Sequence, residues 1–329
     1  MSQASLIPSF SIVLETENLA NASLEGLVKS LASLVNQSLS PSQAQEVILI
    51  DSGDAPPDLL TQLCDRYPWI KIHPAPPTTG YYKAKMLGAQ IATGSIVVYA
   101  DSDCIYEPQW LQTILETFAQ QEDIQIVAGE TTTRGRGPYG TAMAMTYIFP
   151  QYSGKSSLEI TSQYFLNNVA FRRDFLLANP IPTDLPLYRG NCVVHIHQLS
   201  QNHYPIWLNP QARATHAPPD GLSHFFWRFL LIGYDYYWQK QLIKPTTSNS
   251  FYSAENLADR DPTATGIGEK LRIFRDRIRR LFINNPWHII YFPLAIPIMI
   301  ASSLLIYTGY QITRLKPDYL LKTYDRILA

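Results

Sequence analysis

An apolar run that ends in two carboxylates is the feature that most restricts the fold of this chain. Residues 96–100 are Ile-Val-Val-Tyr-Ala, and Asp101-Ser102-Asp103 follows directly. A short, continuously apolar run is typical of a strand buried on both faces, as in sheets covered by helices on both sides. Strand residues i and i+2 point to the same side, so both acids are expected in the crevice at the carboxyl edge of the sheet, where such folds bind ligands.

The spacing of Asp101 and Asp103 predicts a metal site. Two like charges that close would repel one another unless a cation lay between them. A divalent cation with oxygen ligands removes this conflict and can also neutralise a diphosphate. The alternative is structural, because Asp and Ser are favoured helix caps and a helix is predicted shortly afterwards. The surrounding sequence favours the metal site.

Composition restricts the class of protein. Of 329 residues, 46% are hydrophobic and only 16% charged, which is enough for a large core and hints at a membrane segment. The net charge of −1 provides no basic field that would recruit nucleic acid. Cys64, Cys104 and Cys192 show neither a zinc spacing nor a disulfide framework, which fits a reducing compartment. The N-terminus lacks a signal-peptide pattern, so the bulk of the chain is expected in the cytoplasm.

Strand-like and helical patterns alternate over the first half of the chain. Strands are predicted at 10–14, 47–50, 69–72, 96–100 and 124–128. Helices are predicted at 24–35, at 84–92 with Gly94 as its C-cap, at 110–118, and in the aromatic stretch 225–238. Such alternation predicts an α/β fold with a mostly parallel sheet covered by helices on both faces.

The C-terminal part has a membrane-like pattern. Residues 266–283 predict a basic amphipathic helix suited to an anionic membrane surface. Residues 284–312 carry no charge and exceed the ~20 residues needed to span a bilayer, with aromatic residues near both ends. Pro293 and Pro297 leave both a kinked spanning helix and a re-entrant one open, and a buried core helix is the alternative. The basic residues before the segment predict that the N-terminal domain faces the cytoplasm.

Four further segments occur in a recognisable order. Residues 11–18 are Ser-Ile-Val-Leu-Glu-Thr-Glu-Asn, and 47–53 are Val-Ile-Leu-Ile-Asp-Ser-Gly. Residues 80–89 form a helical segment before the strand that leads to the two acids, and 167–173 are Asn-Asn-Val-Ala-Phe-Arg-Arg. With Asp101-Ser102-Asp103 as the metal-binding DxD signature, residues 8–240 resemble the family 2 glycosyltransferases. The resemblance implies the GT-A fold, a Rossmann-like α/β sheet that binds nucleotide sugars.

The resemblance also implies roles for individual residues. Asp51 would accept a hydrogen bond from a uracil-like base, with an Asx turn as the structural alternative. Glu17 stands where the family often has an aromatic residue. The remaining implied roles are as follows: Thr16, Glu17, Asp101 and Lys85 contact the nucleotide sugar; Asp103, with Asp101 and His216, ligates Mn²⁺ or Mg²⁺; Asn168 and Arg172 lie on the acceptor side.

The general base departs from the family pattern. Inverting members usually place a Glu-Asp pair after the acceptor element, and its Asp deprotonates the acceptor hydroxyl. Residues 185–192, Leu-Pro-Leu-Tyr-Arg-Gly-Asn-Cys, contain no acid. Asp184 just upstream and His195 just downstream are the candidates for the base. Two alternatives stay open, namely an acceptor that is already anionic, such as a phosphate, and loss of the usual activity.

The sequence therefore predicts a membrane-associated glycosyltransferase that moves a sugar from a nucleoside diphosphate sugar to a membrane-proximal or lipid-linked acceptor by metal-assisted inverting displacement. A non-catalytic GT-A-like subunit of a membrane glycan-assembly complex is the alternative. A nucleotidyltransferase is disfavoured, because residues 15–21 contain no glycine. The predicted organisation is a GT-A domain at 1–244, a linker at 245–265, the amphipathic helix at 266–283, a transmembrane or re-entrant segment at 284–312 and a tail at 313–329.

Overall fold

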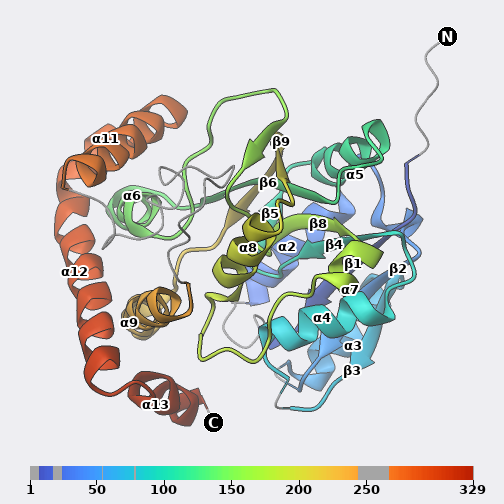
Figure 1. Cartoon of the computed structure of the whole chain (residues 1–329), viewed down its shortest axis with the longest axis horizontal. Coiled ribbons are helices and arrows are strands. Elements are labelled where there is room, and N and C mark those ends of the chain that lie inside the picture. Colours follow the sequence, from blue (N-terminus) through green and yellow to red (C-terminus); the bar gives the residue numbers. More distant parts are fainter. Residues whose placement is uncertain (1–6, 18–23, 54, 78, 244–266, 329) are drawn as a thin grey trace. The chain divides into compact units, whose positions relative to one another are not determined.

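The computed structural model describes residues 7–17, 24–53, 55–77, 79–243 and 267–328 (Figure 1). The chain divides into two compact units, each built from several stretches of sequence. Unit 1 comprises Met1–Thr131, Gly154–Thr183 and Tyr204–His216, and unit 2 comprises Thr132–Ser153, Asp184–His203 and Ala217–Ala329. The predicted domain at 1–244 thus contributes to both units, and the predicted linker at 245–265 lies outside the described residues.

A nine-stranded sheet forms the centre of unit 1. Its order is β3-β2-β1-β4-β8-β6-β9-β5, and β7 pairs with β9. The strand bounds are β1 Phe10–Glu15, β2 Glu46–Asp51, β3 Ile70–Pro74, β4 Ile96–Ala100, β5 Cys104–Tyr106, β6 Ile126–Thr133, β7 Glu159–Thr161, β8 Asn168–Arg172 and β9 Ile206–His216. The predicted strands are therefore present, with small shifts at their ends.

The sheet combines a parallel and an antiparallel part. Strands β3, β2, β1 and β4 are parallel neighbours, as the alternation with helices predicts. Strand β8 then pairs antiparallel with both β4 and β6, and β9 pairs antiparallel with β5 and β7. The predicted α/β sheet flanked by helices is present, and it is mixed. All five residues of β4 are 0% exposed, as expected for a strand covered on both faces.

Helices cover the sheet and complete one apolar core. The core cluster includes Ile12, Leu34, Val98, Trp110 and Leu115, each at most 2% exposed. The helices of unit 1 are α2 Leu24–Val35, α3 Pro57–Arg66, α4 Tyr81–Ile91, α5 Trp110–Gln120 and α7 Arg173–Ala178, with a short 3₁₀ turn at Pro41–Gln43.

Helix α4 differs from the prediction at both ends. It begins at Tyr81, and it ends where the backbone N–H of Ala92 donates to the carbonyl of Gly88. Gly94 is therefore not the C-cap. It lies where the chain passes the backbone of Phe10, and a Cβ at Gly94 would overlap that backbone. The glycine is required by this close approach to β1.

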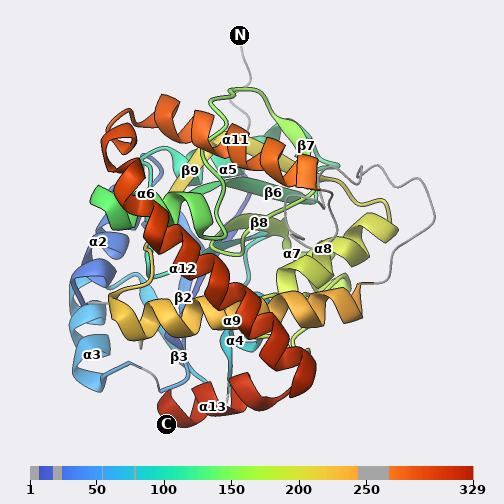
Figure 2. The ribbon, with the colours of Figure 1, turned by 90° about the vertical axis from the view of Figure 1, so that its left-hand side faces the viewer.

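Unit 2 is helical. Figure 2 shows α12 crossing the front of the unit, with α11, α6, α9 and α13 around it. The bounds are α6 Gly137–Thr146, α8 Asn191–Gln201, α9 Gly221–Leu242, α11 Ile267–Asn284, α12 His288–Leu315 and α13 Tyr319–Leu328. Helix α12 continues through Pro293 and Pro297 and is long and apolar enough to cross a membrane by length and composition.

Helices α9 and α12 cross at two glycines. A Cβ on Gly233 would overlap the carbonyl oxygen of Ile306, and a Cβ on Gly309 would overlap that of Leu230. The missing side chains let the two backbones touch, as small residues do at close helix crossings.

Gly309→Ala is expected to destabilise unit 2 by about 1–3 kcal/mol, the usual cost of overpacking. The direction of the stability change is informative, because Gly→Ala at an uncrowded helix position stabilises a protein by about 1 kcal/mol. Thr308→Ala at the exposed neighbouring position is the control and should change the melting temperature little. Thermal unfolding of both variants in the same detergent checks this, and a more stable Gly309→Ala protein would contradict the crossing.

A buried carboxylate holds the loop before α8. The backbone N–H groups of Tyr188 and Arg189 donate to Asp235 at 2.7 and 2.9 Å. Burial raises the pKa of Asp235 to about 6, although these bonds and the nearby Arg228 lower it. The folded state therefore binds this proton more tightly than the unfolded chain, whose carboxyl has its ordinary pKa near 3.8.

The raised pKa predicts a pH dependence of stability. Between about pH 4 and 6 the unfolded chain has lost this proton and the folded chain keeps it. The contribution of Asp235 to stability therefore falls by roughly 1.4 kcal/mol per pH unit as the pH rises through that window. Asp235→Asn cannot ionise, so its unfolding free energy is expected to fall less steeply there. Denaturant titrations at pH 4, 5 and 6 measure the difference, and equal slopes would contradict the assignment.

Candidate functional site

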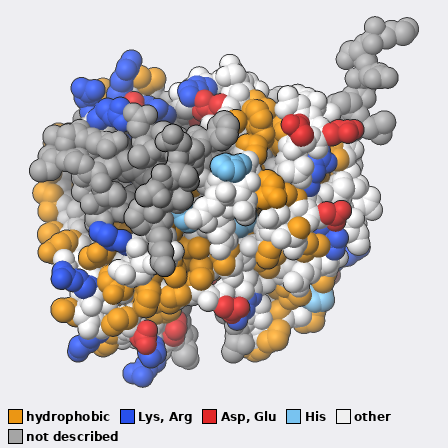
Figure 3. Space-filling model, viewed as in Figure 1, with side chains coloured by type: hydrophobic (Ala, Val, Ile, Leu, Met, Phe, Trp, Pro, Cys, Tyr) orange, Lys and Arg blue, Asp and Glu red, His pale blue; other side chains and the backbone are white. Residues whose placement is uncertain are grey.

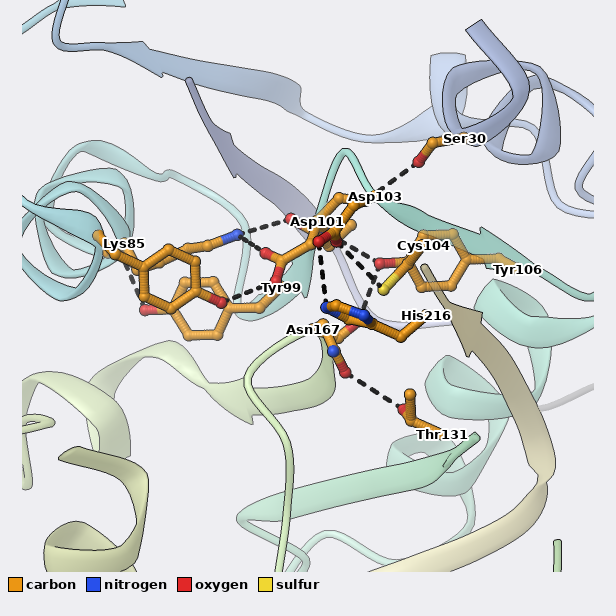
Figure 4. A network of polar contacts seen from close by, with 12 residues as sticks. Ser30, Lys85, Tyr99, Asp101, Asp103, Cys104, Tyr106, Thr131, Asn167 and His216 are labelled. Atoms are coloured by element: carbon orange, nitrogen blue, oxygen red, sulfur yellow. Dashed lines mark hydrogen bonds and ion pairs between the residues drawn. The ribbon is translucent and has the colours of Figure 1, made fainter. Parts of the chain in front are cut away.

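The two predicted acids lie in a tight turn at the carboxyl end of β4. The turn closes with a bond from the Cys104 N–H to the Asp101 carbonyl at 3.3 Å, and β5 then begins at Cys104. Figure 4 shows that Asp101 and Asp103 take different partners. The strand alternation that predicted both carboxylates facing one another across a cation does not extend past Ala100, because the chain turns there.

Asp101 is neutralised by a buried lysine. The Nζ atom of Lys85 lies 2.6 Å from Asp101 Oδ1 and donates equally closely to the carbonyl of Ala100. Tyr81 donates its hydroxyl to Asp101 Oδ2 at 2.8 Å. Both carboxylate oxygens are thus bonded, and Lys85 is 0% exposed. The ammonium group of Lys85 is thus enclosed by the fold and paired with Asp101, and the predicted contact of Lys85 with a donor stays a prediction.

Asp103 belongs to a separate cluster with Cys104 and His216. His216 Nε2 lies 3.1 Å from Asp103 Oδ2, and the thiol of Cys104 lies 3.7 Å from Asp103 Oδ1. The antiparallel register of β5 and β9 pairs Cys104 with His216, which brings the end of β9 to the turn after β4. The predicted pairing of Asp103 and His216 is thus present, although 112 residues separate them.

The cluster fits a divalent metal ion. Its carboxylate, thiol and imidazole ligand atoms all lie within 4.8 Å of one another. To bind one ion together, these side chains would have to move toward a common centre. Cys104 takes the place predicted for Asp101, whose oxygens are held by Lys85 and Tyr81. In the sequence, only the position of Cys104 next to Asp103 pointed to Cys104.

Tyr106 holds the turn in place through two hydrogen bonds to backbone groups. Tyr106 accepts a hydrogen bond from the Asp101 N–H and donates to the Asn167 carbonyl, both at 2.8 Å. Burial raises the pKa of Tyr106 well above its ordinary value, so its hydroxyl stays protonated and able to donate. The Asn167 side chain accepts from Thr131 at 3.2 Å, which links the turn to β6. Asn167 begins the acceptor element of the sequence, whereas no sequence pattern pointed to Tyr106.

The predicted base-binding residues lie at the ends of β1 and β2. The Thr16 hydroxyl donates to Asp51 Oδ1 at 3.1 Å, and the Gly53 N–H donates to the same oxygen at 3.0 Å. The second bond is the Asx turn that was the structural alternative for Asp51. Both bonds use Oδ1, so neither involves Oδ2. Glu17, next to Thr16, is partly exposed.

Asn168 and Arg172, which were predicted on the acceptor side, make hydrogen bonds within the protein. The Asn168 amide donates to the carbonyls of Glu130 and Ala212 and accepts from Trp110 at 2.6 Å, while the side chain is 0% exposed. Its bonds join β8, β6, β9 and α5. Arg172 pairs with Ile96 at the start of β4, roughly 13 Å along the strand from the turn. It donates to carbonyls of α5 and the following loop. The acceptor-side roles of Asn168 and Arg172 stay predictions.

The two candidates for the general base belong to unit 2. Asp184 is exposed just before the loop that Asp235 holds. His195 lies in α8 and is only 1% exposed. A base must reach the acceptor hydroxyl directly or through one water molecule, so the exposed carboxylate of Asp184 is the stronger candidate.

The family model for "Glycosyl transferase family 2" matches residues 20–178, a segment that includes the acidic turn. The chain is similar to the family 2 glycosyltransferases over this segment, which is just under half of its length. Of the three clustered residues, Asp103 and Cys104 lie within the matched segment and His216 lies beyond it.

Curated relatives extend the similarity. "N-acetylgalactosaminyltransferase 6" of Drosophila melanogaster is 30% identical over 103 residues, which are 30% of this chain and 15% of that protein. The chain thus spans only a small part of this relative. "Glucosyl-dolichyl phosphate glucuronosyltransferase" of Haloferax volcanii is 22% identical over 221 residues, which cover 62% of this chain and 68% of that protein.

A solved structure shows the same fold. The mannosyltransferase PcManGT from Pyrobaculum calidifontis, in complex with GDP-Man and Mn²⁺, matches with a TM-score of 0.51 and 17% identity. The match covers 98% of this chain and 85% of that one. The GT-A fold that the resemblance implied is thereby confirmed.

Proposed function

We propose that this protein transfers a sugar from a nucleoside diphosphate sugar to a membrane-proximal or lipid-linked acceptor, with inversion at the anomeric carbon. The observation that carries the proposal is the cluster of Asp103, Cys104 and His216 at the carboxyl end of β4 in a GT-A fold. The complex of PcManGT with GDP-Man and Mn²⁺ supports this class of donor. The name of the glucuronosyltransferase relative supports a lipid-linked acceptor.

In this proposal the chain's residues bind and orient the donor. Asp51 accepts a base N–H through Oδ2, while Thr16 holds its other oxygen and Glu17 lies beside the base or ribose. Asp103 and His216, with the Cys104 thiol beside them, would hold Mn²⁺ or Mg²⁺, and the charge of that ion would stabilise the departing diphosphate. Asp101, held by Lys85 and Tyr81, positions the turn that carries Asp103.

The transfer itself forms a bond between the acceptor oxygen and the anomeric carbon and breaks the bond from that carbon to the diphosphate. Asp184 takes the proton of an acceptor hydroxyl. An acceptor phosphate carries no such proton at neutral pH and would need no base. Asp184→Asn therefore distinguishes the two acceptors, because it slows transfer only to a hydroxyl. The catalytic unit faces the cytoplasm in this proposal.

Donor binding by the full chain in detergent tests the proposal. UDP-, GDP- and dTDP-sugars are titrated by calorimetry with and without Mn²⁺. We expect one donor to bind with a metal requirement, and slow hydrolysis of that donor would show that the site is catalytic. Metal-dependent binding without hydrolysis or transfer to any lipid phosphate would favour the non-catalytic subunit. Absence of binding under every metal condition would overturn the proposal.

A further inference from the structure

Helix α12 buries small and polar side chains and exposes large apolar ones, which is the reverse of a helix in water. The face toward its own unit carries small or polar residues such as Ala295, Ser302 and Gly309, which are buried. The opposite face carries large apolar residues, including Leu294 and Leu304, which are 64% and 59% exposed. Helices in water bury their apolar face. Helices in lipid pack through small residues and turn large apolar ones outward.

Polar groups on the inner face of α12 are satisfied within the protein. Thr141 of α6 hydrogen-bonds His288 at 2.7 Å, and Thr146 of α6 donates to Ser302 at 3.4 Å. The Thr313 hydroxyl donates to the Gly309 carbonyl at 2.7 Å. Such satisfaction is what a helix in contact with lipid requires, because hydrocarbon offers no hydrogen-bond partner.

Protein covers the inner face along most of the length of α12. The contacts of His288 and Ser302 place α6 against the first half, and the Gly233–Gly309 crossing places α9 against the second half (Figure 2). A crossing of the bilayer by α12 would take α9 with it, including the half-buried Arg228 and the buried Asp235. Charged side chains at bilayer depth are costly. A helix lying in the membrane plane avoids this cost.

Helix α11 supplies charge next to this apolar face. Its sequence contains six basic and two acidic residues. Arg277 donates to the carbonyls of Met145 and Tyr147 at 2.9 Å, which attaches α11 to the C-terminal end of α6. Arg275 and Arg279, one turn apart, are exposed. Figure 3 shows basic side chains over α11 at the upper left and hydrophobic ones along the left edge, where α12 lies.

We propose that α11 and α12 form a monotopic attachment surface for an anionic lipid bilayer. Helix α12 lies in the plane of the membrane with its outer face among the acyl chains, and α11 places its arginines at the headgroups. The helix does not cross. Trp287 directly before α12 and Tyr307 in its second half are both exposed and suit the interface between headgroups and hydrocarbon. The proposal rests on unit 2 alone and does not depend on the proposed catalytic function.

Vesicle flotation of the full chain tests the charge component. Vesicles of phosphatidylcholine are compared with vesicles that also contain phosphatidylglycerol. We expect stronger binding to the anionic vesicles, reduced about tenfold or more by Arg275→Glu/Arg279→Glu. Arg66→Glu/Lys71→Glu in unit 1 makes the same change in net charge and should bind as the unaltered chain does. Equal loss in both variants, or no preference for anionic lipid, would overturn the proposal.

The depth of spin labels distinguishes a helix in the membrane plane from a spanning one. Nitroxide labels are placed singly through Ile289→Cys, Ile300→Cys or Tyr307→Cys, which lie on one exposed face of α12. The background is Cys64→Ser, because Cys104 and Cys192 are buried. We expect one shallow depth at all three sites. A depth that passes through the bilayer centre at Ile300, or a detergent-free dimer that covers α12 and binds no vesicle, would overturn the proposal.

Discussion

Asp103→Asn is expected to abolish metal-dependent donor binding and to lower turnover by about 10²- to 10³-fold. Asn keeps the shape of the side chain but loses the negative charge that attracts a cation between Asp103, Cys104 and His216. Removal of one electrostatic stabiliser of a departing group typically costs about this factor. Calorimetry with the donor identified for the unaltered chain, followed by a turnover assay, measures both effects.

Two controls separate metal binding from folding in that experiment. Asp123→Asn removes an exposed carboxylate elsewhere in unit 1 and should leave donor binding unchanged. The melting temperature of Asp103→Asn without metal should stay close to that of the unaltered chain, because the Asp103 side chain is only partly buried. Undiminished Mn²⁺-dependent binding in Asp103→Asn would show that the cation binds elsewhere.

Lys85→Met is expected to destabilise the protein by about 3–5 kcal/mol, enough to lower the folded fraction strongly. Lys85 and Asp101 form an ion pair at 2.6 Å whose side chains are 0% and 4% exposed. Removing one member of such a pair leaves the other charge buried without its counter-ion. Denaturant unfolding gives the loss of free energy.

The neighbouring lysine provides a matched control for this effect. Lys83→Met, on the exposed face of the same helix, should change stability by no more than about 0.5 kcal/mol. Adding Asp101→Asn to Lys85→Met removes the stranded charge and should recover part of the loss. A double variant as unstable as the sum of the two single variants would show that the ion pair is not what Lys85 contributes.

Local sequence determined most of the elements. The apolar run at 96–100 is β4 with the same bounds, and the apolar spacing at 24–35 is α2. Strands and helices of this kind follow from residue periodicity, which the chain carries within a short window. The order of the motifs likewise identified the family, because the nucleotide-sugar fold places its binding residues at the ends of successive parallel strands.

Local sequence patterns did not predict the roles of residues whose partners lie far away along the chain. Lys85 was predicted to contact the donor, but α4 places it on Asp101 inside the core. Arg172 was predicted on the acceptor side, but the antiparallel direction of β8 carries it to the opposite edge of the sheet. Strand direction and helix rotation are set by packing across the whole unit. A local sequence pattern therefore does not predict them.

The sequence by itself determined the α/β class, the position of the two acids at the carboxyl end of β4 and the long apolar C-terminal helix. The tertiary structure alone decided that Cys104 lies beside Asp103 and His216 and that Asp101 is neutralised by Lys85. It also decided which face of α12 is covered. The physical reason is that periodicity reports which residues prefer burial, whereas their partners are chosen when segments far apart in the chain pack together.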